Sequence, residues 1–157
     1  MTKEEELGLA IKLAVEEHHG QSSKDKLPYI LHPLHLMFQL MYDLQLATIA
    51  VLHDVIEDSN GRITLKVLVG MGFSSRVVSA VTLLTHDPKD DYLEVYIPWI
   101  CSNYDAIRVK RKDLEHNGLL TRMRNKKELN SKDLDRIEKY FKAFIILGEA
   151  RDIFKRK

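Results

Sequence analysis

The sequence is short of the features that mark secreted and membrane proteins. It contains a single cysteine, Cys101, which excludes an intramolecular disulfide framework and favours a reducing compartment. Its apolar runs are broken by charge, so none reaches the ~20 residues that a bilayer-spanning helix needs. The first six residues are acidic and lack the apolar core of a signal peptide. We therefore expect a cytoplasmic protein with no membrane partner.

An excess of charge of one sign is also missing. The 24 Lys and Arg residues almost balance the 23 Asp and Glu residues, giving a net charge near +1. Such a balance gives no global attraction to nucleic acid, so no nucleic-acid partner is expected. The exception is the basic segment 122–127, which we interpret as a solvated loop or a rim that faces phosphate.

Strand alternation, internal repeats and linkers are absent as well, and the apolar residues follow helical spacing. We predict one all-α domain, a helical bundle covering residues 1–157, which is an ordinary length for a single domain. In the last helix we expect an inward face made of Leu134, Ile137, Tyr140, Phe141, Phe144 and Ile145. The expected helices cover residues 3–19, 33–42, 43–59, 64–70, 74–84, 91–101 (kinked at Pro98), 103–116 and 131 onward.

One apolar run, residues 46–52, leads directly into the polar sequence His53-Asp54-Val55-Ile56-Glu57-Asp58. On a continuous helix His53 would lie four residues from Glu57, and Asp54 four from Asp58, so these side chains would share one helix end. Nearby carboxylates in an apolar setting repel one another unless a cation neutralises them. Imidazole together with carboxylate suits Mn, Fe or Zn better than Ca. The motif therefore predicts a divalent metal site.

Two residues outside this motif are candidates to complete the ligand set. His32 lies in Pro28-Tyr29-Ile30-Leu31-His32-Pro33, where the prolines restrict the backbone; the alternative is a histidine that caps the following helix. Asp113 precedes Asn117 by four residues, so the two share a helical face; the alternative is an ordinary ion pair with a neighbouring Lys or Arg.

The order of these motifs resembles that of the HD-domain metal-dependent phosphohydrolases. The segments 18–21, 28–34 and 52–58 look like the hydrolase domain of the RelA/SpoT family, and in particular like its small stand-alone alarmone hydrolases. Residues 81–85, Val109-Lys110, Asp113 and Asn117 continue the likeness in the same order, and it extends over roughly residues 7–145.

The resemblance implies roles for individual residues. His32, His53, Asp54 and Asp113 would bind the metal, which in this family is usually Mn²⁺. Glu57 and Asp58 would orient and deprotonate the attacking water. The reaction would remove pyrophosphate from the 3′ position of (p)ppGpp and leave GDP or GTP. The substrate contacts expected from the resemblance and from nearby charge are Lys24, Lys26, Tyr29, Lys110, Asn117, Arg136 and Tyr140.

The sequence departs from the family where the substrate base would bind. Ser22-Ser23 stand where the family commonly has an arginine that packs on guanine, and lysine stacks on a base less well than a guanidinium. Two alternatives therefore stay open: a phosphatase of the same class acting on a nucleoside monophosphate or an NADPH-like substrate, and a non-catalytic alarmone-binding module. Assembly into a homo-oligomer is also left open.

Overall fold

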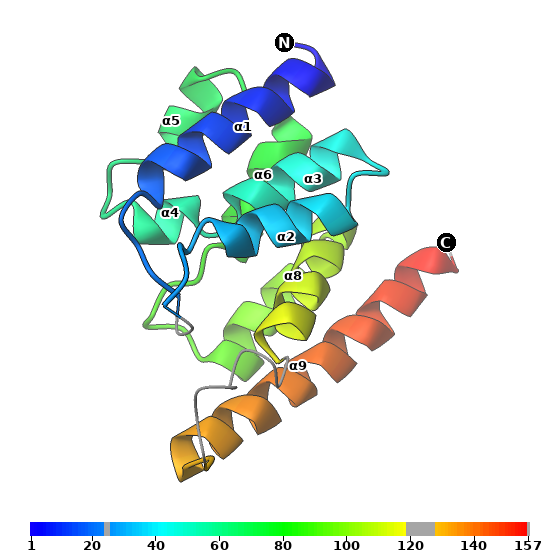
Figure 1. Ribbon diagram of the computed structural model, residues 1–157. Coiled ribbons are helices and arrows are strands. Elements are labelled where there is room, and N and C mark those ends of the chain that lie inside the picture. The colour runs from blue at the N-terminus through cyan, green and yellow to red at the C-terminus, as the bar shows by residue number, and fades with distance from the viewer. Residues whose placement is uncertain (24–25, 119–127, 157) are drawn as a thin grey trace.

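A computed structural model describes residues 1–23, 26–118 and 128–156, and within these ranges the regular elements are helices (Figure 1). The all-α prediction is therefore confirmed. No helix in the described ranges is both long enough and apolar enough to cross a bilayer. The elements, in chain order, are α1 (Lys3–Glu17), α2 (Leu31–Gln39), α3 (Leu44–Leu52), α4 (Val55–Asp58), α5 (Leu65–Gly70), α6 (Ser75–Leu84), the π-helical turn η1 (Tyr92–Tyr96), α7 (Ile97–Ile100), α8 (Tyr104–Asn117) and α9 (Ser131–Lys155).

Short polar side chains set the helix starts. The capping residues of α3, α5, α6 and α8 each accept a hydrogen bond on their side chain from a backbone N–H of the first turn; they are Asp43, Thr64, Ser74 and Asn103. Each bond satisfies a donor that has no partner inside its helix, and such a cap stabilises a helix by about 1 kcal/mol.

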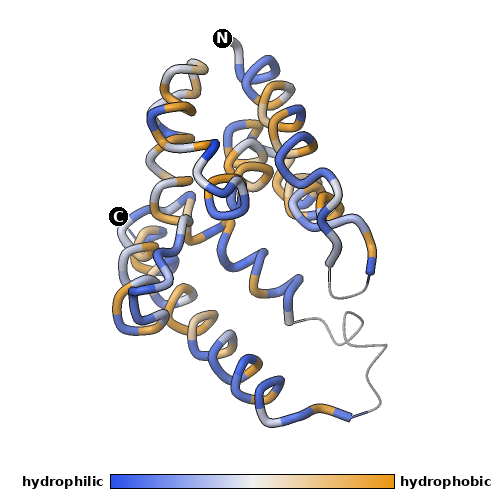
Figure 2. The backbone as a smooth tube through the Cα atoms, turned by 90° about the vertical axis from the view of Figure 1, so that its left-hand side faces the viewer, coloured by the Kyte–Doolittle hydropathy of each residue, from blue (hydrophilic) through white to orange (hydrophobic). Residues whose placement is uncertain are grey.

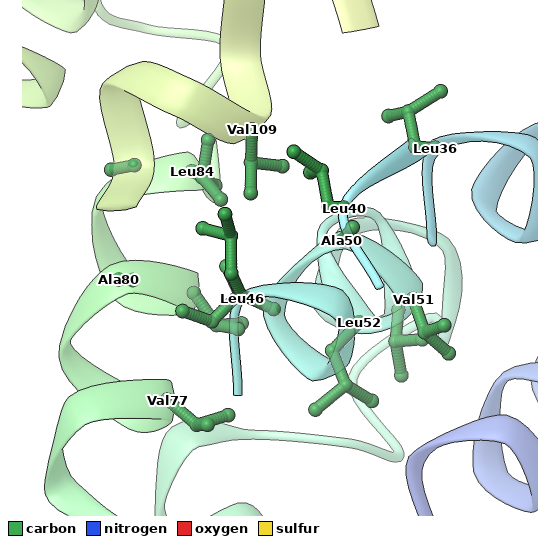
Figure 3. Packing of buried hydrophobic residues seen from close by; sticks show 14 of the residues in the cluster. Leu36, Leu40, Leu46, Ala50, Val51, Leu52, Val77, Ala80, Leu84 and Val109 are labelled. Carbon is green, nitrogen blue, oxygen red and sulfur yellow. The ribbon is translucent and has the colours of Figure 1, made fainter. Parts of the chain in front are cut away.

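Helix α3 lies at the centre of the molecule, packed against α1, α2, α6 and α8. All seven residues from Leu46 to Leu52 are buried, which is the pattern of a helix covered on every side. Leu36 of α2, Leu40 at the C-terminal end of α2 and Val109 of α8 lie around it (Figure 3). The core thus fixes the end of α3, where the predicted metal motif begins.

The motif does not continue α3, so the prediction of one helix over residues 43–59 is wrong. Helix α3 ends at Leu52, His53 and Asp54 form a turn, and α4 starts at Val55. The His53 imidazole Nδ1 is 2.8 Å from the Ala50 carbonyl oxygen, the acceptor that a continuing helix would offer to the amide of Asp54. This competing contact accounts for the break.

The prediction of one kinked helix over 91–101 also needs correction. A π-helical turn, capped by Asp91, leads into the short helix α7, and Pro98 lies in the first turn of α7. Proline has no N–H to donate to the carbonyl of Glu94, so regular α-helical bonding cannot run through this point.

The predicted inward face of α9 is half wrong. Ile137, Tyr140 and Phe144 are partly buried as expected, but Leu134, Phe141 and Ile145 are 54%, 64% and 45% exposed. Polar and apolar residues are interleaved along this helix (Figure 2), and it docks on α8 through a narrower stripe that includes Ala143 and Leu147. Since α9 packs mainly on one neighbour, only one stripe can be covered.

Candidate metal centre

Two imidazoles and two carboxylates converge from three parts of the fold. His32 comes from α2, His53 and Asp54 from the turn between α3 and α4, and Asp113 from α8. His53 Nε2 is 2.9 Å from an Asp54 carboxylate oxygen, and His32 Nε2 is 3.1 Å from Asp113 Oδ1. His53 Nε2 is also 3.8 Å from that oxygen of Asp113. One donor atom each from His32, His53 and Asp54 lie within 4.8 Å of one another, which is close enough to share an ion.

The two ring nitrogens of His53 have different surroundings. Nδ1 lies 2.8 Å from the Ala50 carbonyl oxygen, which can only accept, so Nδ1 carries a proton and donates it. Nε2 is fully buried and has no hydrogen bond of acceptable geometry, although Asp54 is adjacent. In the neutral ring, therefore, the Nε2 lone pair faces the cluster, as in histidines that bind metals through one nitrogen and a carbonyl through the other.

His32 does not cap α2, so the alternative role considered from the sequence is wrong. The N-cap position belongs to Ile30, which makes no side-chain cap, and His32 is buried inside the first turn. Its Nδ1 is 2.6 Å from Nδ1 of His116, whose ring stacks on it and on His35. With Nδ1 of His32 as the donor in that contact, its Nε2 lone pair faces the carboxylates. Burial lowers the pKa of His32, which favours the neutral ring that a metal requires.

Asp54 is held in its ionised form by its neighbours. Burial alone would raise its pKa, but the adjacent His53 outweighs burial and lowers the pKa to about 2. The hydroxyl of Tyr29 donates a hydrogen bond to Asp54 Oδ2. The same interaction acts in reverse on His53: burial would lower the pKa of the imidazole, yet Asp54 raises it to about 9.

Asp113 makes the ion pair considered from the sequence and also faces the candidate metal ligand His32. Its Oδ2 pairs with Lys110 Nζ at 2.8 Å, while Oδ1 faces the imidazole of His32 and accepts from the Asn117 amide at 2.5 Å. Although burial opposes it, Lys110 keeps the pKa of Asp113 well below its usual range. Lys110 itself lies 5.3 Å from the centre of the Tyr96 ring. These contacts fix the carboxylate in one orientation.

Glu57 and Asp58 border the cluster from α4. Burial and the charge of Asp54 raise the pKa of both carboxyls. Glu57 accepts a hydrogen bond of 2.5 Å from the backbone N–H of His86, and Asp58 lies 3.5 Å from Nδ1 of His18. A carboxylate with a raised pKa is a better proton acceptor near neutral pH, so these two groups suit a base beside the cluster.

The charges of this region fit a divalent cation. Asp54, Asp113, Glu57 and Asp58 bring four carboxylates together. Lys110 pairs with Asp113, and without a metal His53, whose pKa Asp54 raises to about 9, is also positively charged; a bound ion would displace the proton on its Nε2. An ion of charge +2 would offset most of the remaining negative charge, and His53 Nε2 would gain the partner it lacks. The mixed nitrogen and oxygen donors suit Mn, Fe or Zn.

The structure brings only some of the predicted substrate-binding residues to the candidate metal centre. Tyr29, Lys110 and Asn117 touch the carboxylates of the cluster. Lys26 is exposed and lines a separate cavity beside Gln21.

On α9, Arg136 pairs with Asp133 of its own helix, and the Tyr140 ring lies 6.3 Å from that of Tyr92. Lys24 lies outside the described residues.

Sequence analysis assigned no specific contact to two histidines of this region, which it left as either surface groups or groups that support the metal ligands. The structure agrees with the second role: His18 is buried between Asp58 and Tyr29, and His116 stacks on His32. The segment 18–21 gave a signal for the first, because the Gln21 side chain holds His18 Nδ1 at 3.0 Å. His116 follows Asp113 by three residues on α8, a spacing that places both on one helical face.

Comparisons with known proteins cover only part of the chain. No family model matches. Two curated sequences from Arabidopsis thaliana, both named "Putative GTP diphosphokinase RSH1, chloroplastic", are 38% identical to this chain over 53 residues. The aligned segment is 32% of this chain and 6% of the length of that protein. The chain is therefore similar to a small part of a much longer relative.

Proposed function

We propose that this protein is a metal-dependent phosphohydrolase that removes the 3′-pyrophosphate of (p)ppGpp, giving GDP or GTP and pyrophosphate. The observation that carries the proposal is the convergence of His32, His53, Asp54 and Asp113, with the buried Nε2 of His53 lacking a hydrogen-bond partner. These four residues would hold the ion, for which Mn²⁺ is the first choice. The ion, when bound, would polarise a phosphoryl oxygen and lower the pKa of a water molecule.

The surrounding residues supply the remaining chemistry. Glu57, next to Asp58, accepts a proton from the attacking water, and its raised pKa suits that task. The water oxygen bonds to the proximal phosphorus of the 3′-pyrophosphate while the bond from that phosphorus to the ribose 3′ oxygen breaks. The ribose oxygen leaves as a hydroxyl after taking up a proton. Tyr29 and Asn117 hold Asp54 and Asp113 in place through hydrogen bonds.

The choice of substrate has two supports. The motifs of the chain resemble those of alarmone hydrolases, and a third of the chain is similar to a protein named as a GTP diphosphokinase. A different nucleotide is the second candidate, because Ser22-Ser23 replace the base-stacking arginine and Lys26 is directed to a separate cavity. A non-catalytic binding module is less consistent with the complete set of ligand and base residues.

A turnover assay with Mn²⁺ distinguishes these functions. The enzyme is incubated separately with ppGpp, GMP, dGMP and NADPH, and with ATP plus GTP, and the products are separated by chromatography. GDP and pyrophosphate from ppGpp are the expected products. Release of inorganic phosphate from another nucleotide, with ppGpp left intact, would show that this other nucleotide is the substrate. Synthesis of ppGpp from ATP and GTP, without hydrolysis, would overturn the proposed reaction.

A further inference from the structure

A second cavity, of about 390 Å³, lies between α8 and α9 and is lined mainly by cations. Five cationic side chains and one carboxylate, that of Glu115, contribute to it; the cations are Arg108, Arg111, Lys112, Arg151 and Lys155. Tyr42 and Tyr104 add aromatic surface to the same cavity, and Tyr42 is 72% exposed. The lining thus combines positive charge with aromatic surface.

This cavity is separate from the candidate metal centre. On α8, Lys110 and Asp113 face the metal centre, whereas Arg108, Arg111 and Lys112 line the cavity. Successive helical residues turn by about 100°, which places these two groups on opposite faces of α8. The two sites share a helix and no lining residue.

Arg111 is held in place before any ligand arrives. Its Nη1 donates to the Phe144 carbonyl oxygen at 2.7 Å, and its guanidinium carbon lies 3.7 Å from the centre of the Phe144 ring. Gly148, inside α9, makes room for it: a Cβ at that position would lie 2.7 Å from Nη1. A glycine inside a helix costs about 1 kcal/mol relative to alanine, so the space for this guanidinium is obtained at a cost in stability.

The positive charge of the cavity is not fully neutralised. Lys112 pairs with Glu115, Arg151 with Asp152, and Arg108 with Asp105. Among the described residues, no carboxylate lies within ion-pair distance of Arg111 or Lys155. Burial and the neighbouring Arg151 lower the pKa of Arg111, as expected of a cation facing like charge.

We propose that this cavity binds a nucleoside phosphate, with the phosphates on Arg111, Arg151 and Lys155 and the base against Tyr42. A guanidinium with unused N–H donors binds phosphate well, and an aromatic ring stacks on a planar base. The volume of about 390 Å³ falls in the range of small-ligand sites. A concave site of this size suits a small molecule better than the face of an acidic protein, which needs about 800 Å² from each partner.

The test is calorimetric titration of the full chain with GDP, ADP, inorganic pyrophosphate and guanosine, with EDTA present to keep the metal centre free of ions. GDP and ADP should bind with a Kd below about 1 mM, pyrophosphate about tenfold more weakly, and guanosine not measurably. The variant Arg151→Gln/Lys155→Gln changes two cavity-lining residues of α9 and should weaken GDP binding by about tenfold or more. Arg111→Gln should do the same, but Arg111 also packs on Phe144, so the double variant carries the test.

Two controls fix the location of the binding site. Lys66→Gln removes a distant exposed cation from α5, and Asp54→Ala alters the metal centre; neither should change the Kd for GDP. Absence of GDP and ADP binding up to about 1 mM would overturn the proposal, as would an unchanged Kd in the double variant. Equal affinity for pyrophosphate and GDP would remove the role given to Tyr42 and overturn the nucleoside assignment. Binding of poly-glutamate without binding of GDP would overturn it in favour of an acidic protein partner.

Discussion

The orientation of His53, a proposed metal ligand, is set by a neighbouring backbone carbonyl. The hydrogen bond from Nδ1 to the Ala50 carbonyl fixes the tautomer and the ring orientation, and it leaves Nε2 directed at Asp54. The same bond separates α3 from α4, so the break in the helix and the orientation of the ligand have one cause.

Replacing His53 by alanine removes a predicted metal ligand, so the affinity for Mn²⁺ should fall by roughly 100-fold or more, since loss of even an outer partner costs 10–100-fold. Calorimetric titration with Mn²⁺ measures this change. His19→Ala is the matched control, because it makes the same substitution at an exposed histidine that is not one of the four expected ligands. Equal affinity in the two variants would remove His53 from the ligand set.

Glu57→Gln tests the proposed base separately from the metal. The amide keeps the shape of the side chain but cannot accept a proton, so kcat should fall by about 10²- to 10⁴-fold. Affinity for Mn²⁺ should change little, because Glu57 is not among the four expected ligands. Retained turnover, measured by pyrophosphate release, would show that another group takes the proton.

At the scale of single residues, much of the candidate site could be predicted from the sequence. His32, His53, Asp54 and Asp113 were expected together from motif order, and the structure brings them together. The segment 18–21 and the spacing from Asp113 to His116 point to His18 and His116, but the burial of the first ring and the stacking of the second also depend on which distant element covers them.

At the scale of elements, one arginine links helices far apart in sequence. Arg76 of α6 bonds Asp43, the cap of α3, at 2.6 Å and Asp105 of α8 at 2.7 Å. Burial tends to raise the pKa of both carboxyls, but their bonds to Arg76 lower it below the usual value. This network connects the N-terminal ends of α3 and α8; His53 directly follows α3, and Asp113 lies within α8.

The network should make stability depend on pH in one direction. Both carboxyls have a folded pKa below the unfolded value of about 3.9, so their contribution is present above pH ~4 and is lost as pH falls through the folded pKa. Urea unfolding of the metal-free protein between pH 7 and pH 2.5 should show this loss, and Arg76→Gln should be less stable at pH 7 by about 1 kcal/mol. The difference between the two proteins should shrink in acid; a constant difference would contradict the network.

Gly148 and Arg111 give a second prediction about elements. Gly148→Ala would normally stabilise a helix by about 1 kcal/mol, but here the new Cβ meets a guanidinium that Phe144 holds in place. The substitution should therefore give no gain in the wild type, yet should gain about 1 kcal/mol in an Arg111→Gln background. Unfolding of the four proteins in urea completes the cycle. The same gain in both backgrounds would show that Arg111 does not occupy this space.

The helices themselves were largely predictable, because their caps and apolar spacing are local. The errors came from tertiary choices. Helix α9 exposes Phe141 and Leu134 because it packs mainly on α8, and the turn at His53 depends on a side chain competing for a backbone carbonyl. Periodicity shows that a helix has an apolar face, but it does not show how much of that face the neighbouring helices will bury.

At the scale of the whole molecule, α8 connects the two sites described above. One of its faces carries Asp113 toward the metal centre, and the other carries Arg111 toward the basic cavity. Helix α3 supplies the rigid base, since it is buried on all sides and ends just before His53 and Asp54. The bundle therefore holds the proposed metal ligands, which come from distant parts of the chain, around one point.

The most direct test of this account is anomalous diffraction at the manganese edge from crystals grown with Mn²⁺. We predict one strong peak bounded by Nε2 of His32, Nε2 of His53 and the carboxylates of Asp54 and Asp113, with donor distances near 2.2 Å, about the length of metal bonds to nitrogen and oxygen ligands. A peak elsewhere, or none at saturating Mn²⁺, would contradict the metal centre on which the proposed function depends.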